Sequence, residues 1–236
     1  MPNSYFQFKQ FRVEQGRAAM KVCTDACVLG AYAGVDGAAR ILDVGTGTGL
    51  LALMVAQRNA EARIDAVEVD EGACAQATDN ANASPWAGRI RVIRGRIQDY
   101  DPGIRYDLIL SNPPFYENHL KRPAAAQNVA LHGEALSLPE LAAAVHRLLG
   151  PAGRFVVLLP PYQAGRLEAL LFAFHLFPAD HLHLHDRPGA PPIRRITTYT
   201  STSPDPCRET ELFIRDATGA YTDDFVRLLK PYYLYL

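Results

Sequence analysis

The chain has 236 residues, of which 48% are hydrophobic and 21% charged, so it is long enough to bury a substantial core. Its formal net charge of −1 excludes the overall basic field of many nucleic-acid-binding proteins, although it does not exclude a local basic patch. No apolar run reaches the roughly 18–20 residues of a membrane helix, and the start, MPNSYFQFKQF, lacks the apolar core of a signal peptide. We expect a soluble, cytoplasmic protein with no membrane partner.

Cysteine and histidine spacing gives little support for a metal site. The cysteines are Cys23, Cys27, Cys74 and Cys207. They form no CxxC pairs, so we expect reduced thiols and no bound metal. His181, His183 and His185 alternate with leucines, and one strand face presents all three imidazoles. A solvent-facing strand over a leucine core is the favoured interpretation of that pattern over a metal site.

Strands and helices alternate along the chain. Residues 5–13 alternate apolar and polar side chains, which predicts a hairpin ahead of the main sheet. From residue 40 onward, strands are predicted at 40–44, 63–69, 89–95 and 106–111, with helices at 50–60 and 70–84. A helix, a glycine-containing turn and a buried strand follow over 136–160, then a helix over 163–177.

This alternation predicts an α/β fold with a doubly wound, mostly parallel sheet. The segments HLHLHD, RRITTYTSTS and TELFIRD look like late antiparallel strands. We expect a single domain over 1–236, with 1–35 as a hairpin and closing segment and 36–236 as the core. The segment from Glu117 to Glu134 shows no period and is expected to be a mobile loop near the site.

The segment LDVGTGTGLLAL carries a glycine-rich turn between a strand and a helix. Gly45, Gly47 and Gly49 allow a tight turn and close approach of a ligand to the backbone, and the helix start offers free N–H groups. The pattern is GxGxG, not the GxGxxG of dinucleotide-binding enzymes, and Asp43 precedes it. A plain structural turn and a nicotinamide or flavin enzyme are the alternatives. The pattern resembles motif I of class I S-adenosylmethionine-dependent methyltransferases, with Thr46 inside the loop.

Acidic residues follow the next two strands. Glu68 lies about 20 residues beyond the loop, where a carboxylate accepts the hydroxyls of a ribose. Asp70 follows two residues later and either shares or flanks that role. Asp99 occupies the position at which methyltransferases of this class commonly bind the adenine amino group, so the resemblance implies that role for it.

The strand YDLILS ends in Asn112, Pro113, Pro114 and Phe115. Proline fixes the backbone and holds the preceding residue extended, so the Asn112 side-chain oxygen and the Pro113 carbonyl are presented at a strand end. Two such acceptors aimed at an exocyclic amine favour the positive charge that develops on nitrogen during methyl transfer. Phe115 is suited to stacking on an extruded base. NPPF matches the motif IV pattern of amino-group methyltransferases, which is not specific for the substrate.

The N-terminal FQFKQFRVEQGRAAMKVCTDACVLGAYA narrows the substrate, together with ASPWAGRI, IQDY and the ending YTDDFVRLLKPYYLYL. These segments resemble the bacterial tRNA(Val) adenine-N6 methyltransferases, which modify the adenine 3′ of the anticodon. The resemblance implies a class I methyltransferase fold with a seven-stranded sheet, S-adenosyl-L-methionine as cofactor and tRNA as partner. It places Lys21, Thr24 and Asp25 in a segment that closes over the cofactor.

Basic residues that could meet RNA phosphates are scattered. They are Lys9, Arg12, Arg17, Lys21, Lys121, Arg122, Arg187, Arg194 and Arg195. The expected function is methyl transfer to adenine N6 in tRNA by a monomer. Guanine-N2 methylation of rRNA is the first alternative. Glutamine-N5 methylation of protein and a catalytically silent S-adenosylmethionine or RNA binder are the others.

Overall fold

The computed structural model describes residues 3–114, 136–202 and 206–236. Several predictions therefore lie outside the described residues: the loop 117–134, the stacking role of Phe115, and RNA contacts by Lys121 and Arg122.

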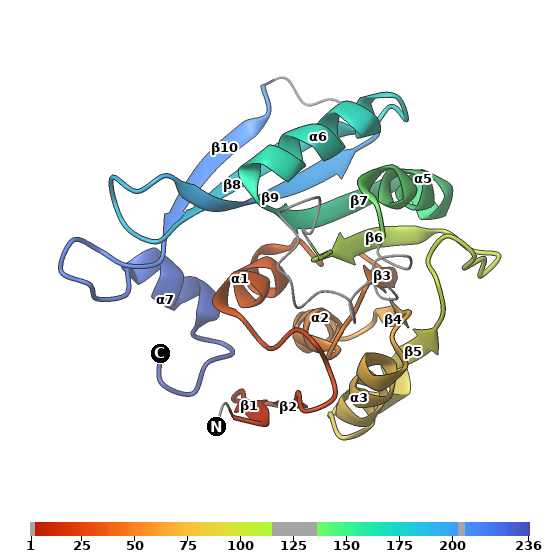
Figure 1. The fold of residues 1–236 in the computed structure, drawn as a ribbon, viewed down its shortest axis with the longest axis horizontal. Helices are drawn as coiled ribbons and strands as arrows, with labels where there is room; N and C mark the ends of the chain where they lie inside the picture. Colours follow the sequence, from red (N-terminus) through yellow and green to blue (C-terminus); the bar gives the residue numbers. More distant parts are fainter. Residues whose placement is uncertain (1–2, 115–135, 203–205) are drawn as a thin grey trace, which may run out of the picture.

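Within the described residues, an eight-stranded sheet has the order β10-β8-β9-β7-β6-β3-β4-β5 (Figure 1). Its strands are β3 (Arg40–Val44), β4 (Arg63–Glu68), β5 (Ile90–Arg94), β6 (Tyr106–Ser111), β7 (Leu149–Leu159), β8 (Phe177–His185), β9 (Pro192–Thr200) and β10 (Arg208–Phe213). β9 runs antiparallel to β7 and β8, whereas the other neighbouring strands pair in parallel. The predicted α/β class with a mostly parallel sheet is confirmed.

The strand count differs from the prediction of seven, and the direction of the last strand was wrong. TELFIRD contributes to β10, which pairs in parallel with β8 and not as an antiparallel strand. Both edges of β9 are already occupied, by β7 and β8. β10 therefore lies at the outer edge of β8 and pairs with it there. It is the eighth strand of the sheet and runs in the same direction as β8.

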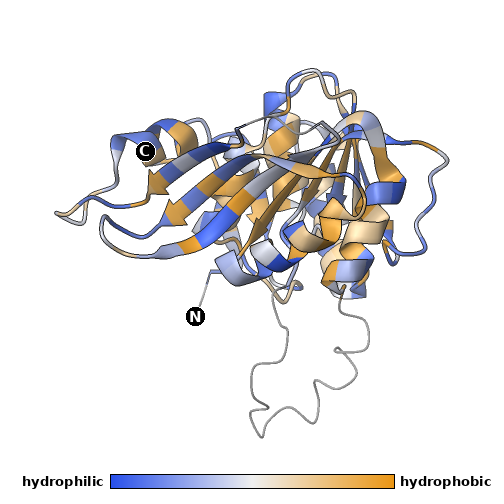
Figure 2. Ribbon diagram, turned by 90° about the horizontal axis from the view of Figure 1, so that it is seen from above, coloured by the Kyte–Doolittle hydropathy of each residue, from blue (hydrophilic) through white to orange (hydrophobic). Residues whose placement is uncertain are grey.

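Helices cover both faces of the sheet (Figure 1). α1 (Thr24–Tyr32), α2 (Leu50–Arg58) and α3 (Glu71–Asn82) lie on one face, and α5 (Leu138–Leu148) and α6 (Pro161–Phe172) on the other. Each side has its own hydrophobic core. The central strands are apolar along most of their length, as expected for strands buried on both faces (Figure 2).

The chain termini pack together. β1 (Tyr5–Gln7) and β2 (Arg12–Glu14) pair antiparallel, which confirms the predicted hairpin. Phe8 bridges to Tyr233, and the Lys9 ammonium donates to the Lys230 carbonyl oxygen at 2.5 Å. α7 (Asp223–Leu229) leads into this contact. The sequence ending therefore anchors the N-terminal hairpin against the core.

The strand order reverses between β3 and β6, because β4 and β5 extend to one side and β6 and β7 to the other. In sheets of this kind, ligands bind beyond the carboxyl ends of the strands at that reversal. Among the described residues, the structure contains no helix whose length and apolar character would let it cross a membrane.

Candidate active site

A cavity of about 230 Å³ lies beyond the carboxyl ends of β3, β4 and β6. Its lining includes the glycine loop after β3, the ends of β4 and β5, and the proline turn after β6, together with parts of the N-terminal segment. Its lining includes Gly45, Gly47, Glu68, Asp70, Ile97, Gln98, Pro113 and Pro114. The cavity therefore brings together residues that the sequence places on separate motifs.

The glycine loop has left-handed backbone at three positions, with φ of +70° at Gly45, +57° at Gly47 and +82° at Gly49. Side-chain-bearing residues adopt this conformation at a cost, so glycine is required here. A Cβ built at Gly45 or Gly47 would meet no atom within 4 Å, so both positions border open space. The loop thus forms a cradle that a ligand, and not another part of the protein, can fill.

Glu68 ties this loop to the end of β4. Its Oε2 accepts the backbone N–H of Gly47 at 2.8 Å, and its Oε1 accepts the N–H of Asp70 at 3.0 Å. Asp70 in turn caps α3 by accepting from the N–H of Ala73 at 2.7 Å. Asp70 is therefore a helix cap whose side chain borders the cavity, while the Glu68 carboxylate faces both the loop and the cavity.

Asp43 and Thr46 lie beneath the loop and not on the cavity surface. The Thr46 hydroxyl donates to Asp43 Oδ2 at 2.5 Å, and both residues are buried. Burial raises the pKa of the Asp43 carboxyl to about 7, against the opposing effect of the Thr46 hydrogen bond. Oδ1 of Asp43 has no hydrogen-bond partner among the described residues. The pair supports the loop from inside the sheet.

The proline turn stands directly across from the loop. The Ser111 hydroxyl donates to the Val44 carbonyl at 2.9 Å, which joins the end of β6 to the end of β3. Asn112 follows and is half-buried, Pro113 is buried, and Pro114 is exposed. The Asn112 Oδ1 is buried and, within the described part of the chain, accepts no hydrogen bond. An unpartnered acceptor is costly in a protein interior, which points to a donor on a bound molecule.

Asn112 itself does not line the cavity, although the next two residues do. Four further predicted cofactor residues are placed elsewhere. Asp99 is not among the residues that line the cavity, and its side chain is 79% exposed, 4.0 Å from Arg96. Asp25 forms an ion pair with Arg194 at 2.9 Å, and Thr24 and Lys21 are exposed. None of the last three lines the cavity.

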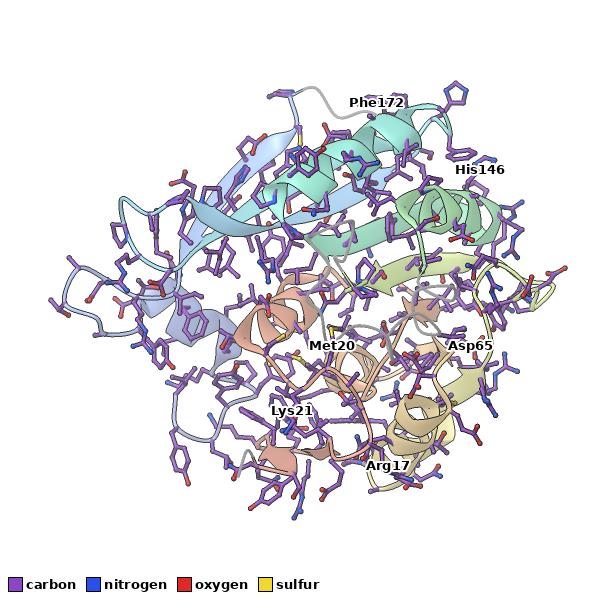
Figure 3. All side chains as sticks on the ribbon, in the orientation of Figure 1. Arg17, Met20, Lys21, Asp65, His146 and Phe172 are labelled. Atoms are coloured by element: carbon purple, nitrogen blue, oxygen red, sulfur yellow. The ribbon has the colours of Figure 1, made fainter. Side chains whose placement is uncertain are left out.

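Other residues take those places. The segment Ala18, Ala19 and Met20 lines the cavity, as do Gln98 and Leu136. The N-terminal segment therefore does reach the cavity, through residues that immediately precede Lys21. In the projection of Figure 3, Lys21 lies nearer the N-terminal hairpin than Met20 does. In the sequence, the run RAAM was the available sign that this segment lines the cavity, because two small residues and a flexible apolar one follow the arginine.

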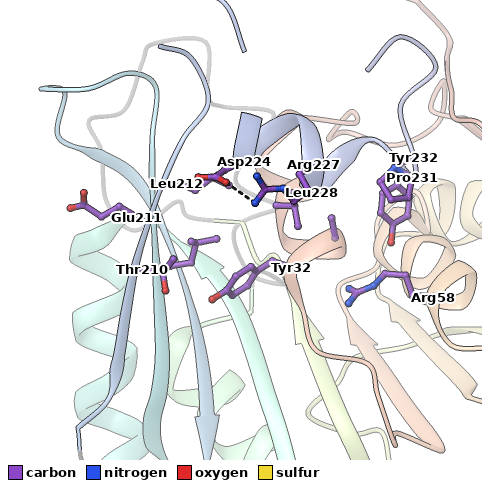
Figure 4. Close-up of a pocket in the computed structure, with 12 residues that line it drawn as sticks. Tyr32, Arg58, Thr210, Glu211, Leu212, Asp224, Arg227, Leu228, Pro231 and Tyr232 are labelled. Carbon is purple, nitrogen blue, oxygen red and sulfur yellow. Dashed lines mark ion pairs between the residues drawn. The ribbon is translucent and has the colours of Figure 1, made fainter. Parts of the chain in front are cut away.

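A larger cavity, of about 520 Å³, lies between α1, β10 and α7 (Figure 4). None of the predicted site residues lines it. Its charged groups already interact: Arg227 pairs with Asp224 at 3.0 Å, and Arg58 donates to the Ala33 carbonyl at 2.6 Å. Among the described residues, its lining has no counterpart of the glycine loop or the proline turn.

The basic residues predicted to meet RNA are mostly paired within the protein. Arg17 pairs with Asp79, Arg12 with Glu14, Arg187 with Asp186 and Arg195 with Glu168. Among those of them that the structure describes, no single patch of free cations is therefore formed.

The first cavity suits a nucleoside-containing ligand. It combines apolar walls from Val67, Val69 and Ile97 with the Glu68 carboxylate, which can accept from hydroxyl groups. The open space beside Gly45 and Gly47 lets a ligand approach the backbone.

Comparison with known proteins finds methyltransferases, in agreement with the motifs of the sequence. The family model described as "Methyltransferase small domain" matches residues 32–137. A protein of Bacteroides thetaiotaomicron named tRNA1(Val) (adenine(37)-N6)-methyltransferase is 40% identical over the full length of both chains. Proteins of the same name from Pedobacter heparinus and Tolumonas auensis are 43% and 42% identical, covering 97% of this chain in each case.

Solved structures show a similar fold. A predicted O-methyltransferase of Agrobacterium tumefaciens aligns with a TM-score of 0.62 and 19% identity, covering 88% of this chain and 96% of that one. A class I S-adenosylmethionine-dependent methyltransferase of Listeria monocytogenes aligns with a TM-score of 0.58 and 15% identity, over 79% and 62%. At these identities the likeness shows the fold. The full-length matches at about 40% identity carry the closer relationship, and by them the chain belongs to the tRNA1(Val) (adenine(37)-N6)-methyltransferase family.

Proposed function

We propose that this protein transfers a methyl group from S-adenosylmethionine to N6 of an adenine in tRNA, at position 37 beside the anticodon. The relatives of similar length carry that activity in their names. One observation in this chain carries the proposal: the Asn112 Oδ1 is a buried acceptor with no partner among the described residues, and the next two residues, Pro113 and Pro114, line the cavity.

The cavity residues fit the methyl donor. Gly45 and Gly47 border the open space in which it would lie, and Glu68 would accept from its ribose hydroxyls. Gln98, and not Asp99, offers an amide to the adenine end, because Gln98 lines the cavity and Asp99 does not. When bound, S-adenosylmethionine supplies an electrophilic methyl group on a sulfonium.

Asn112 and Pro113 act on the nucleophile. The adenine amine is weakly nucleophilic because its lone pair is delocalised into the ring. The Asn112 Oδ1 and the Pro113 carbonyl would each accept one N–H of that amine and orient its lone pair. They would also stabilise the positive charge that grows on nitrogen as the new bond forms, which is preorganised electrostatic catalysis.

The rigidity of this arrangement follows from local structure. The Ser111 hydroxyl fixes the turn to the end of β3, and the two prolines restrict the backbone on either side of the Pro113 carbonyl. The acceptors therefore need little reorganisation on binding. We keep Phe115 as the stacking residue, on the basis of its place in the motif. A single domain over 1–236, a monomeric state and a cytoplasmic location complete the proposal.

The proposal is tested by incubating the protein with labelled S-adenosylmethionine and tRNA from a strain lacking the gene, followed by nuclease digestion and nucleoside mapping. N6-methyladenosine at position 37 of tRNA(Val) is expected. Methylguanosine, or label in protein only, would overturn it. Unmodified adenine in the recipient RNA is verified beforehand, so that a lack of transfer counts against the proposal.

A further inference from the structure

Away from the catalytic cavity, a group of metal-ligating side chains gathers on β8 and β10. The ligand atoms of His181, Cys207 and Glu209 all lie within 4.8 Å of one another. β9 and β7 separate this edge of the sheet from β6, which carries Asn112. The group therefore stands apart from the proposed methyl-transfer site.

The strand register explains why these residues meet. His181 of β8 is the direct partner of Glu209 on β10, and side chains two residues apart on a strand point to the same face. His183 consequently shares that face with them, and Cys207, which immediately precedes β10, has its thiol within the same cluster. Leu182 and Leu184 point the other way, into the core beside α1 and α2.

The prediction that these histidines face solvent was wrong for two of the three. His181 is 6% and His185 is 7% exposed. Alternation assigned the histidines to one face correctly, but it gave no sign that α6 covers part of that face: Glu168 of α6 lies 3.7 Å from His181 Nε2. His185 is held separately from the cluster. Its Nδ1 lies within hydrogen-bond distance, 2.8 Å, of the Ala190 carbonyl oxygen, and its ring packs on Phe213.

His181 is oriented as a metal ligand is. Its Nδ1 lies 3.1 Å from the hydroxyl of Thr197, which is fully buried, so the ring is fixed from behind. Metal-binding histidines nearly always use the second ring nitrogen in this way. Nε2 points to the cluster, where the nearest carboxylate oxygens, of Glu168 and Glu209, lie 3.7 and 4.0 Å away, beyond hydrogen-bond distance.

His183 lies beside the cluster and is not one of its members. Its Nε2 lies 2.7 Å from Glu209 Oε2, and its side chain is 28% exposed. The clustered ligand set is one imidazole, one thiol and one carboxylate. These are the ligands that Zn²⁺ prefers in four-coordinate sites, and a thiol disfavours Mg²⁺ and Ca²⁺.

The surrounding charges are compatible with a cation. Glu168 is occupied by Arg195 at 2.8 Å, so that arginine is neutralised beside the cluster. Arg208 is likewise held by Asp180 at 2.7 Å. These pairs leave the Glu209 carboxylate to face the cation, which would bind the Cys207 thiolate directly.

We propose that His181, Cys207 and Glu209 form a zinc site that fastens the edge strand β10 to β8. One ligand comes from β8 and two come from β10 or the residue before it, so a bound ion crosses the strand pair. The site stabilises the sheet edge and takes no part in methyl transfer.

The test uses untagged full-length protein, stripped with a chelator and titrated with Zn²⁺ or Co²⁺. We expect one tightly bound equivalent per chain, a thiolate-to-cobalt charge-transfer band with Co²⁺, and a rise in Tm with Zn²⁺. Cys207→Ser is expected to abolish the charge-transfer band and the rise in Tm. Cys23→Ser, at an exposed thiol outside the cluster, is the matched control and is expected to keep both.

A second variant leaves every proposed ligand in place, so it tests the site even if a variant that lacks a ligand misfolds. Thr197→Val keeps the shape of the side chain and removes the hydroxyl behind His181, so we expect an affinity about 10–100-fold lower with the cobalt band retained. His146→Gln, on α5, is its control and should bind as the wild type does.

Zinc bound as tightly by Cys207→Ser as by the wild type would overturn the site, and so would a wild type that binds zinc only weakly and shows no charge-transfer band with Co²⁺. Methyl transfer by Cys207→Ser is expected to match the wild type, so failure of the zinc site is distinguishable from failure of the proposed activity.

Discussion

The carboxylate of Glu68 accepts the backbone N–H of Gly47 at 2.8 Å, which joins the end of β4 to the glycine loop that follows β3. One side chain therefore both shapes the cradle and borders the cavity. Loop geometry and ligand recognition are coupled through this residue.

Glu68→Gln tests this coupling. The amide must turn an NH₂ group toward either the Gly47 or the Asp70 N–H, each of which the carboxylate now satisfies. Because hydrogen bonds to a charged group contribute about 1.5–3 kcal/mol, we expect cofactor affinity to fall about 10–100-fold in calorimetry. Glu71→Gln, an exposed partner of Arg94 on the neighbouring helix, is the control. Equal affinities of Glu68→Gln and Glu71→Gln for the cofactor would show that Glu68 does not contribute to cofactor binding.

Gly47→Ala tests the loop conformation. At a φ of +57°, a Cβ costs about 1–2 kcal/mol, and this one would also project into the open space beside the cavity. We expect loss of cofactor binding and a lower free energy of unfolding in urea. Gly165→Ala in α6, where a Cβ meets no atom within 4 Å, should instead be more stable by up to about 1 kcal/mol. Unimpaired cofactor binding by Gly47→Ala would refute the role of this loop.

Asp43 predicts a pH dependence of stability. Its folded pKa of about 7 lies above the ordinary 3.8, so the folded state binds more protons than the unfolded state between these values. The free energy of unfolding should therefore fall as pH rises from about 4 to about 7, by at most about 4 kcal/mol from this group. Asp43→Asn removes this contribution, so the variant should gain stability relative to wild type across that range.

The check is urea unfolding of both proteins at a series of pH values, with Asp36→Asn at an exposed position as control. Parallel pH profiles for wild type and Asp43→Asn would show that the buried carboxyl does not titrate in this range.

Removal of the hydrogen bond between Tyr106 and Asp65 tests whether stability can be changed without a change in activity. The Tyr106 hydroxyl donates to Asp65 Oδ2 at 2.6 Å, at the start of β6, the opposite end of that strand from Asn112. Tyr106→Phe should lower the free energy of unfolding by about 2 kcal/mol and leave methyl transfer per folded molecule unchanged. Tyr162→Phe, at a side chain 72% exposed, should change neither. A loss of specific activity in Tyr106→Phe would mean that the two ends of the strand are coupled.

The central elements of the fold could be predicted because their signals are local. The strand at 40–44, the glycine loop and the strand at 106–111 each have a short pattern that a parallel sheet requires, and β3 and β6 occupy those same residues. α1 was missed because its residues 26–31 are all buried, so it has no amphipathic period. α7 was missed although Thr222 caps it and acidic residues follow, because only seven residues form it.

Side-chain direction within turns was not predictable from spacing. Gln98 and Asp99 are neighbours in one turn, and only Gln98 lines the cavity. Likewise, Met20 reaches the cavity and Lys21 does not. The parallel pairing of β10 depends on which strand edge is left free, a property of the assembled sheet and not of the segment.

The most direct test of the account is the single-turnover rate of methyl transfer to tRNA by Asn112→Ala, measured alongside its affinity for S-adenosylmethionine. Removing one preorganised hydrogen-bonding group from a developing charge costs about 100–1,000-fold in rate. We expect a loss of at least that size with cofactor affinity within a few-fold of wild type, and no change for Asn82→Ala on the exposed surface of α3. A rate near that of the wild type would contradict the role of Asn112 and, with it, the assignment of the proline turn as the catalytic centre.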